Sequence, residues 1–193
     1  MTVKRKKDNA GKNTHETRQT KEKNSRRGLW TVLACVALGI VAGIFAGIAL
    51  IRIPPAAEMV FAVEDLRITL TENFAAFEND RFAGVLVSED VGVTVLKEPF
   101  SQVPGSEGLS LEEYGHLVIT NNDITGTMLC TKNGLTFFEF TRENAETGQV
   151  FAYFAAVYKS VDAFWLVQMG VPDEDYTQWR ETLEVYARSV IFE

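Results

Sequence analysis

The chain has 193 residues, a formal net charge of -7 and 46% hydrophobic residues, which is enough for one ordinary domain and accessory segments. The charge is unevenly divided: residues 1–27 carry ten basic and three acidic side chains, whereas residues 52–193 carry nine basic and 23 acidic ones. The acidic C-terminal part argues against nucleic acid as a partner, because duplex binding depends on Lys and Arg contacts to phosphates.

The first 27 residues are rich in Lys, Arg, Asn, Thr and Gln and contain almost no large apolar side chain. Such a segment cannot bury enough surface to offset the entropy lost on ordering. Residues 1–27 are therefore predicted to be a disordered basic tail.

The next segment, residues 28–51, contains no charged side chain. At about 1.5 Å per residue, a helix of this length can cross a hydrocarbon core of roughly 30 Å. The sequence therefore predicts one transmembrane helix, and the basic flank predicts a cytoplasmic N-terminus and a C-terminal domain outside the cell membrane. We interpret the helix as an uncleaved signal anchor. A cleaved signal peptide, or a lipoprotein processed at Cys35 in the segment VLAC, remains an alternative.

Three glycines recur at every fourth position of this apolar segment: Gly39, Gly43 and Gly47. Small residues at this spacing let two membrane helices approach closely. The stripe predicts a helix-packing face, used in a homodimer or against another membrane protein. The alternative is chance, because glycine is common in transmembrane helices.

Residues 52–59 contain Pro54 and Pro55 and are predicted to form a short stalk before a domain over residues 60–193. Cys130 is the only cysteine of that domain, so it has no partner for an internal disulfide. Because it ends the apolar segment TMLC, we expect Cys130 to be buried, with pairing between two chains as the alternative.

The first half of the domain predicts strands at 66–70, 83–88 and 91–96, the last two forming a hairpin with Val91, Val93 and Val95 on one face. The segment Ser110 to Glu113 has the spacing of a capping box, which predicts a helix of about ten residues ending near Asn121 and Asn122.

The second half predicts a strand at 124–130, an Asn133-Gly134 turn and a strand at 135–141. Residues 150–159 and 163–170 are apolar on both faces, which is typical of central strands covered on both sides. Pro172 then opens a second helix with an apolar stripe from Tyr176 to Val190, before a short edge strand. These elements predict the α+β class, with a mostly antiparallel sheet flanked by helices.

This order of elements resembles that of the PsbP-like family. The resemblance covers roughly residues 60–193 and rests on DAFWLVQ at 162–168, the helix opened by Pro172 with Tyr176 and Trp179, and SVIF at 189–192. It implies an antiparallel sheet sandwiched between helices, an α/β/α sandwich. Many bacterial members of the family are membrane-anchored or lipoproteins, and the photosynthetic members are non-enzymatic accessory subunits. No metal or photosystem contact of the family can be matched to a residue here.

The sequence contains no HExxH, CxxC, GxSxG, P-loop or GxGxxG pattern. His116 is the only histidine of the predicted domain and is expected to be a surface or half-buried helix residue. We therefore assign no catalytic residue, no cofactor and no metal ligand from the sequence, and expect a protein that is not an enzyme.

Aromatic side chains are dense in the later strands, and most of them are expected in the core. If strand alternation exposes Phe138 or Tyr153, either could line a groove for a partner. The leading hypothesis is a bacterial, single-pass, membrane-anchored extracytoplasmic domain without catalytic activity that binds an unknown protein or envelope ligand.

Two alternatives remain open. One is an envelope hydrolase whose acidic residues meet only in the fold. The other is a subunit that acts mainly through pairing of its transmembrane helix.

Overall fold

The computed structural model describes residues 57–103 and 105–193, which contain two antiparallel sheets. The larger sheet has seven strands: β3 (Ala75–Phe77), β4 (Gly84–Val87), β5 (Gly92–Pro99), β9 (Ala163–Pro172), β8 (Val150–Lys159), β7 (Leu135–Glu143) and β6 (Cys130–Lys132), in that spatial order. The smaller sheet has the order β1 (Glu58–Val63), β2 (Leu66–Thr71), β10 (Ile191–Phe192). The helices are α2 (Leu111–Asn121), α3 (Tyr176–Arg188) and the short 3-10 helices η1 (Phe100–Gln102), η2 (Ser106–Gly108) and η3 (Asp173–Asp175).

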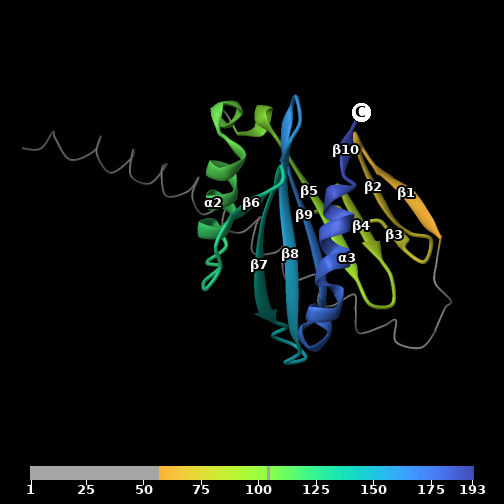
Figure 1. The fold of residues 1–193 in the computed structure, drawn as a ribbon. Helices are drawn as coiled ribbons and strands as arrows, with labels where there is room; N and C mark the ends of the chain where they lie inside the picture. Colours follow the sequence, from red (N-terminus) through yellow and green to blue (C-terminus); the bar gives the residue numbers. More distant parts are fainter. Residues whose placement is uncertain (1–56, 104) are drawn as a thin grey trace, which may run out of the picture.

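The elements form layers around the larger sheet. Helix α2 lies on one face, and helix α3 with the smaller sheet lies on the other (Figure 1). Each face has its own core: Tyr114 and Val118 of α2 belong to one, and Leu183 and Tyr186 of α3 belong to the other. The arrangement is the α+β architecture that the order of elements predicts.

Strands β8 and β9 are the centre of the larger sheet. Each pairs with a strand on both sides, and the side chains of β9 from Ala163 to Val171 are all buried. Alternation sends Phe164 and Leu166 toward α2, and Trp165 and Val167 toward α3. The prediction of two central strands covered on both faces is confirmed.

Local signals in the sequence set several turns and helix ends. Ser110 Oγ accepts a hydrogen bond from the backbone N–H of Glu113, and the Glu113 carboxylate accepts one from the backbone N–H of Ser110, so the predicted capping box is formed. Asn133 and Gly134 both have positive φ, 51° and 79°, which a two-residue hairpin turn requires. The hairpins β4–β5 and β6–β7 are both present.

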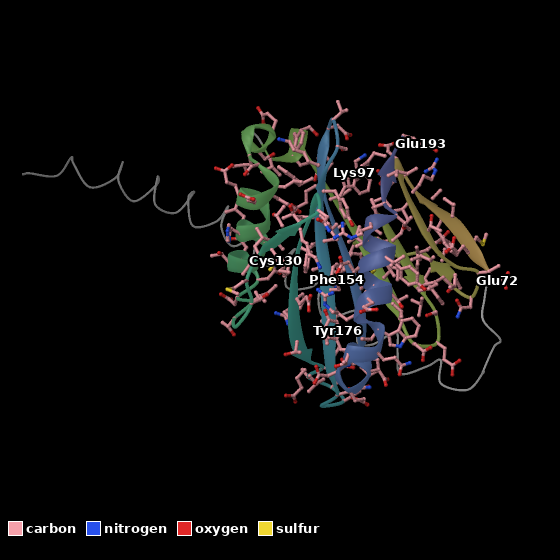
Figure 2. The ribbon with its side chains drawn as sticks, viewed as in Figure 1. Glu72, Lys97, Cys130, Phe154, Tyr176 and Glu193 are labelled. Carbon is pink, nitrogen blue, oxygen red and sulfur yellow. The ribbon has the colours of Figure 1, made fainter. Side chains whose placement is uncertain are left out.

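Lys97 links the two sheets. Its ammonium lies 3.1 Å from carboxylate oxygens of Glu64 and Asp65, in the turn between β1 and β2, and 3.4 Å from Asp162. Burial alone would lower the pKa of Lys97, but hydrogen bonds to the three carboxylates raise it above its ordinary value. Figure 2 shows Lys97 at the end of the larger sheet where β10 also ends.

Three features differ from the sequence prediction. Strand β1 begins at Glu58, inside the predicted stalk. Most of its residues are exposed, so its sequence shows no alternation of buried apolar and exposed polar side chains. The three-residue strand β3 has no expected counterpart and is exposed throughout. The predicted strand over 124–130 is wrong in its first part: only Cys130–Lys132 pair as β6. Before it, Thr127 Oγ1 donates to the Glu139 carbonyl, and Leu129 packs against Gly115.

The predicted tail and transmembrane segment, residues 1–27 and 28–51, lie outside the described residues. Within residues 57–103 and 105–193, no helix is both long and apolar enough to cross a membrane.

The two faces of α3 provide a matched stability test. Leu183 is fully buried and Val185 is 62% exposed on the same helix. We expect Leu183→Ala to lower the free energy of unfolding by about 2–5 kcal/mol, through lost burial and a cavity. Val185→Ala should change it by less than about 0.5 kcal/mol. Urea denaturation of the full-length protein, followed by tryptophan fluorescence, measures both; equal losses would contradict the assigned orientation of α3.

Candidate functional site

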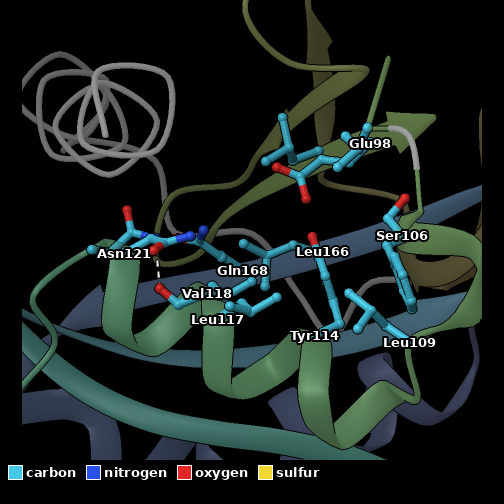
Figure 3. A pocket seen from close by; sticks show the side chains of 13 residues that line it. Glu98, Ser106, Leu109, Tyr114, Leu117, Val118, Asn121, Leu166 and Gln168 are labelled. Carbon is cyan, nitrogen blue, oxygen red and sulfur yellow. Dashed lines mark hydrogen bonds between the residues drawn. The ribbon is translucent and has the colours of Figure 1, made fainter. Parts of the chain in front are cut away.

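A pocket opens between α2 and strands β5 and β9, on the α2 face of the larger sheet (Figure 3). Its cavity volume is about 70 Å³. A cavity needs roughly 10–15 Å³ to hold one water, so this one can hold several waters or a small ligand group. Concave, mostly apolar sites with a few converging polar groups are the usual form of a ligand site.

The floor of the pocket follows from the register of β5 and β9. Leu96 lies opposite Leu166, Glu98 opposite Phe164, and Thr94 opposite Gln168. Residues directly opposite in an antiparallel pair share a face of the sheet. The register therefore places an apolar stretch in the middle, with Glu98 at one end and Gln168 at the other.

Helix α2 forms the opposite wall. Tyr114, Val118 and Asn122 are four residues apart, so they lie on one face of the helix and its C-terminal cap. Tyr114 stacks on Phe164 with ring centroids 4.2 Å apart. Leu129 packs against Gly115, where a Cβ would lie 2.7 Å from a Leu129 methyl group and the leucine side chain would have to shift. The capped start and these contacts hold α2 in place over β9.

Glu98 and Tyr114 point toward one another in Figure 3. Burial raises the pKa of the Glu98 carboxyl, and the neighbouring Tyr114 hydroxyl offsets part of this rise. Burial, and then the charge of Glu98, raise the pKa of Tyr114 well above its ordinary value. None of the ion pairs within residues 57–103 and 105–193 includes Glu98. The pocket thus contains a partly desolvated carboxyl group without a basic partner from the described residues.

Four other polar side chains of the lining are buried, each at most 6% exposed. Three of them have an atom without a hydrogen-bond partner among the described residues: Ser106 Oγ, Asn122 Oδ1 and Gln168 Oε1. The hydroxyl of the fourth, Tyr114, faces Glu98. A buried polar group without a partner costs about 1–3 kcal/mol, and native proteins contain few of them. Because these atoms converge on one cavity, waters or the polar groups of a ligand can satisfy them there, which makes the pocket the candidate site.

The structure places Phe138 and Tyr153 in the interior, each 1% exposed. Both belong to the core under α2, and the Tyr153 ring stacks on Phe140 with centroids 4.9 Å apart. Neither can line a surface groove, so the partner-binding role considered for them is corrected. The reason is that β7 and β8 present these residues to the face that α2 covers.

The other candidate residues have different outcomes. Gly39, Gly43 and Gly47 lie outside the described residues, so the helix-packing face stays a prediction. Cys130 is exposed, which corrects the expectation that it is buried. It lies on β6, the outermost strand of the larger sheet, and all three residues of that strand are exposed. Figure 2 shows Cys130 beside α2.

Sequence patterns do not single out the pocket residues, because they belong to no motif. One signal was present: Gln168 interrupts the otherwise apolar strand AFWLVQMG, and Thr94 interrupts VGVTVL. A polar residue in a strand buried on both faces needs a partner or a ligand. Glu98, Tyr114 and Asn122 carry no comparable signal in the sequence.

No protein-family model and no curated protein matches the sequence. Solved structures do match the fold. Cyanobacterial PsbP (CyanoP) from Synechocystis sp. PCC 6803 is similar with a TM-score of 0.50 and 9% identity, over 74% of this chain and 95% of that one. The Saccharomyces cerevisiae Ran-binding protein Mog1p has a TM-score of 0.48 and 10% identity, over 71% and 96%.

LpqN, a Mycobacterium tuberculosis protein involved in cell envelope biogenesis, has a TM-score of 0.36 and 12% identity, over 69% of this chain and 88% of that one. At these identities, a match establishes only the fold. The described part of the chain has the PsbP-like fold, as the resemblance in its sequence predicts.

Proposed function

We propose that this protein is a membrane-anchored, extracytoplasmic binding or accessory domain without catalytic activity of its own, and that it binds its ligand in the pocket beneath α2. The observation that carries the proposal is the set of buried, unpartnered polar atoms around an otherwise apolar cavity. Such atoms are costly in the free protein and become favourable when a ligand satisfies them.

The composition of the pocket supports recognition more than hydrolysis. Glycoside hydrolysis by paired acids needs a second carboxyl group facing the first, roughly 5 to 9 Å away. The described residues that line the cavity include one carboxylate, Glu98, and no His or Cys. We therefore favour a binding role over the hydrolase alternative.

The anchoring part of the proposal rests on the sequence. The uncharged segment 28–51, with its basic N-terminal flank, favours a single span with the folded domain on the outer side. We further propose that the stripe of Gly39, Gly43 and Gly47 on this anchor packs against a membrane-protein partner or against a second copy in a homodimer.

The exposed cysteine makes the topology testable. Cys130 lies on the surface of the folded domain. We expect a membrane-impermeant maleimide to label Cys130 on intact protoplasts expressing the full-length protein, and Cys130→Ser to abolish the labelling. Labelling of Cys130 only after permeabilisation would place the domain on the cytoplasmic side and contradict the proposed topology.

The location of the binding site can be tested by photo-crosslinking in native membranes. Leu117, 44% exposed, lies at the pocket, and Val185, 62% exposed, lies on α3 across the sheet. A photoreactive amino acid at position 117 should yield an adduct of defined mass on the intact protein, and the same amino acid at position 185 should not. Adducts at 185 alone, or equal adducts at both positions, would contradict a site beneath α2.

A further inference from the structure

Besides the hydroxyls of Ser106 and Tyr114, the pocket contains hydrogen-bond acceptors that lack a donor. The amide of Asn122 has a fixed orientation because its Nδ2 donates to the Val118 carbonyl at 2.7 Å, so the atom left without a partner is the acceptor Oδ1. Gln168 also presents its oxygen Oε1 without a partner. With the carboxylate of Glu98, three side chains around the cavity offer oxygen acceptors, which a ligand must match with N–H or O–H donors.

The negative charge of Glu98 indicates that the ligand donor facing it is a cation. Lys159, on β8 across Phe164 from Glu98, does not neutralise it. Its ammonium donates instead to the carbonyl oxygens of Glu107 and Leu109, at 2.7 Å each. A half-buried carboxylate without a counterion is stabilised when a cation reaches it, and the hydrogen bond between the two is then charge-assisted.

The net negative charge of the whole domain also favours a cationic ligand. Residues 57–193 carry 23 acidic and eight basic side chains. A surplus of this sign raises the local concentration of cations around the domain and lowers that of anions. The surroundings of the pocket therefore favour a cationic ligand over an acidic one.

The cavity walls indicate an elongated apolar body for the ligand. Glu98 pairs with Phe164, four residues before Gln168, so the backbone positions of these two polar residues are roughly 13 Å apart along the strands, at about 3.3 Å per residue. Between them lie Leu96 and Leu166 from the strands, and Val118 from α2. This apolar stretch suits a chain of methylene groups, because burying each CH₂ against apolar side chains is favourable.

We propose that the pocket binds a small molecule with a primary ammonium group on an apolar chain, the ammonium against Glu98 and the chain along Leu96 and Leu166. The amide oxygens of Asn122 and Gln168 then accept a donor at the far end of the ligand. This inference rests on the proposed function, a binding site beneath α2, and adds the chemistry of its ligand.

The test compares three probes of similar shape and different charge: n-pentylammonium, 1-pentanol and pentanoate. Full-length protein in lipid nanodiscs is titrated with each probe, and methyl NMR shifts of Leu96, Val118 and Leu166 report binding in the pocket. We expect n-pentylammonium to bind at least about tenfold more tightly than 1-pentanol, as a charge-assisted hydrogen bond implies, and pentanoate not to bind.

A pair of isosteric variants tests the role of the carboxylate. Glu98→Gln removes the charge in the pocket, whereas Glu181→Gln makes the same change at an exposed position on α3. We expect Glu98→Gln to weaken n-pentylammonium binding about tenfold or more and to leave 1-pentanol unaffected, with Glu181→Gln equal to the wild type. Dispersed methyl spectra confirm that each variant is folded, and the comparison of probes on the wild type needs no variant.

Each other outcome has a distinct meaning. If 1-pentanol or pentanoate binds as tightly as n-pentylammonium, or if Glu98→Gln does not weaken the amine, the inferred ligand chemistry is overturned while a binding site beneath α2 still stands. If none of the probes shifts the pocket methyl groups, the inferred chemistry is again overturned. The proposed function fails separately, when crosslinking at position 117 yields no adduct.

Discussion

The structure depends on the burial of β8 and β9 from both sides. These strands place large apolar side chains on both faces, such as Phe164 toward α2 and Trp165 toward α3. If only one face of the sheet were covered, the apolar side chains on the other face would stay in water, at a cost of roughly 25 cal/mol for each Å² of exposed apolar surface. Two covering layers are therefore required, and helix α2 supplies one while helix α3 and the smaller sheet supply the other (Figure 1).

The candidate site lies where one of these layers is incomplete. Helix α2 packs over β7 and β8 but leaves the β5 side of its face open. There the strands carry the polar residues Thr94, Glu98 and Gln168. Polar groups in a sheet this deeply covered reduce stability unless something satisfies them. Functional sites are commonly places where a fold that is well packed elsewhere is locally less stable.

The sequence predicts what local chemistry determines. The two-sided apolar strands, the Asn133-Gly134 turn and the Ser110 capping box each act within a few residues, and each prediction is confirmed. Strands β1 and β3 were missed because their exposed residues depend on backbone pairing with a neighbour. The pocket was missed because Glu98 meets Tyr114 only through the packing of α2 on β5 and β9, and the exposure of Cys130 depends on which strand ends the sheet.

The pKa of Glu98 tests the central claim, that the pocket holds a carboxylate in need of a cation. It can be measured by ¹³C NMR of the side-chain carboxyl group in the full-length protein, with and without n-pentylammonium. Burial predicts a pKa above the ordinary 4.5 in the free protein, and because an ammonium favours the ionised form, saturation with the amine should lower it. An ordinary pKa that does not change on adding the amine would contradict the account.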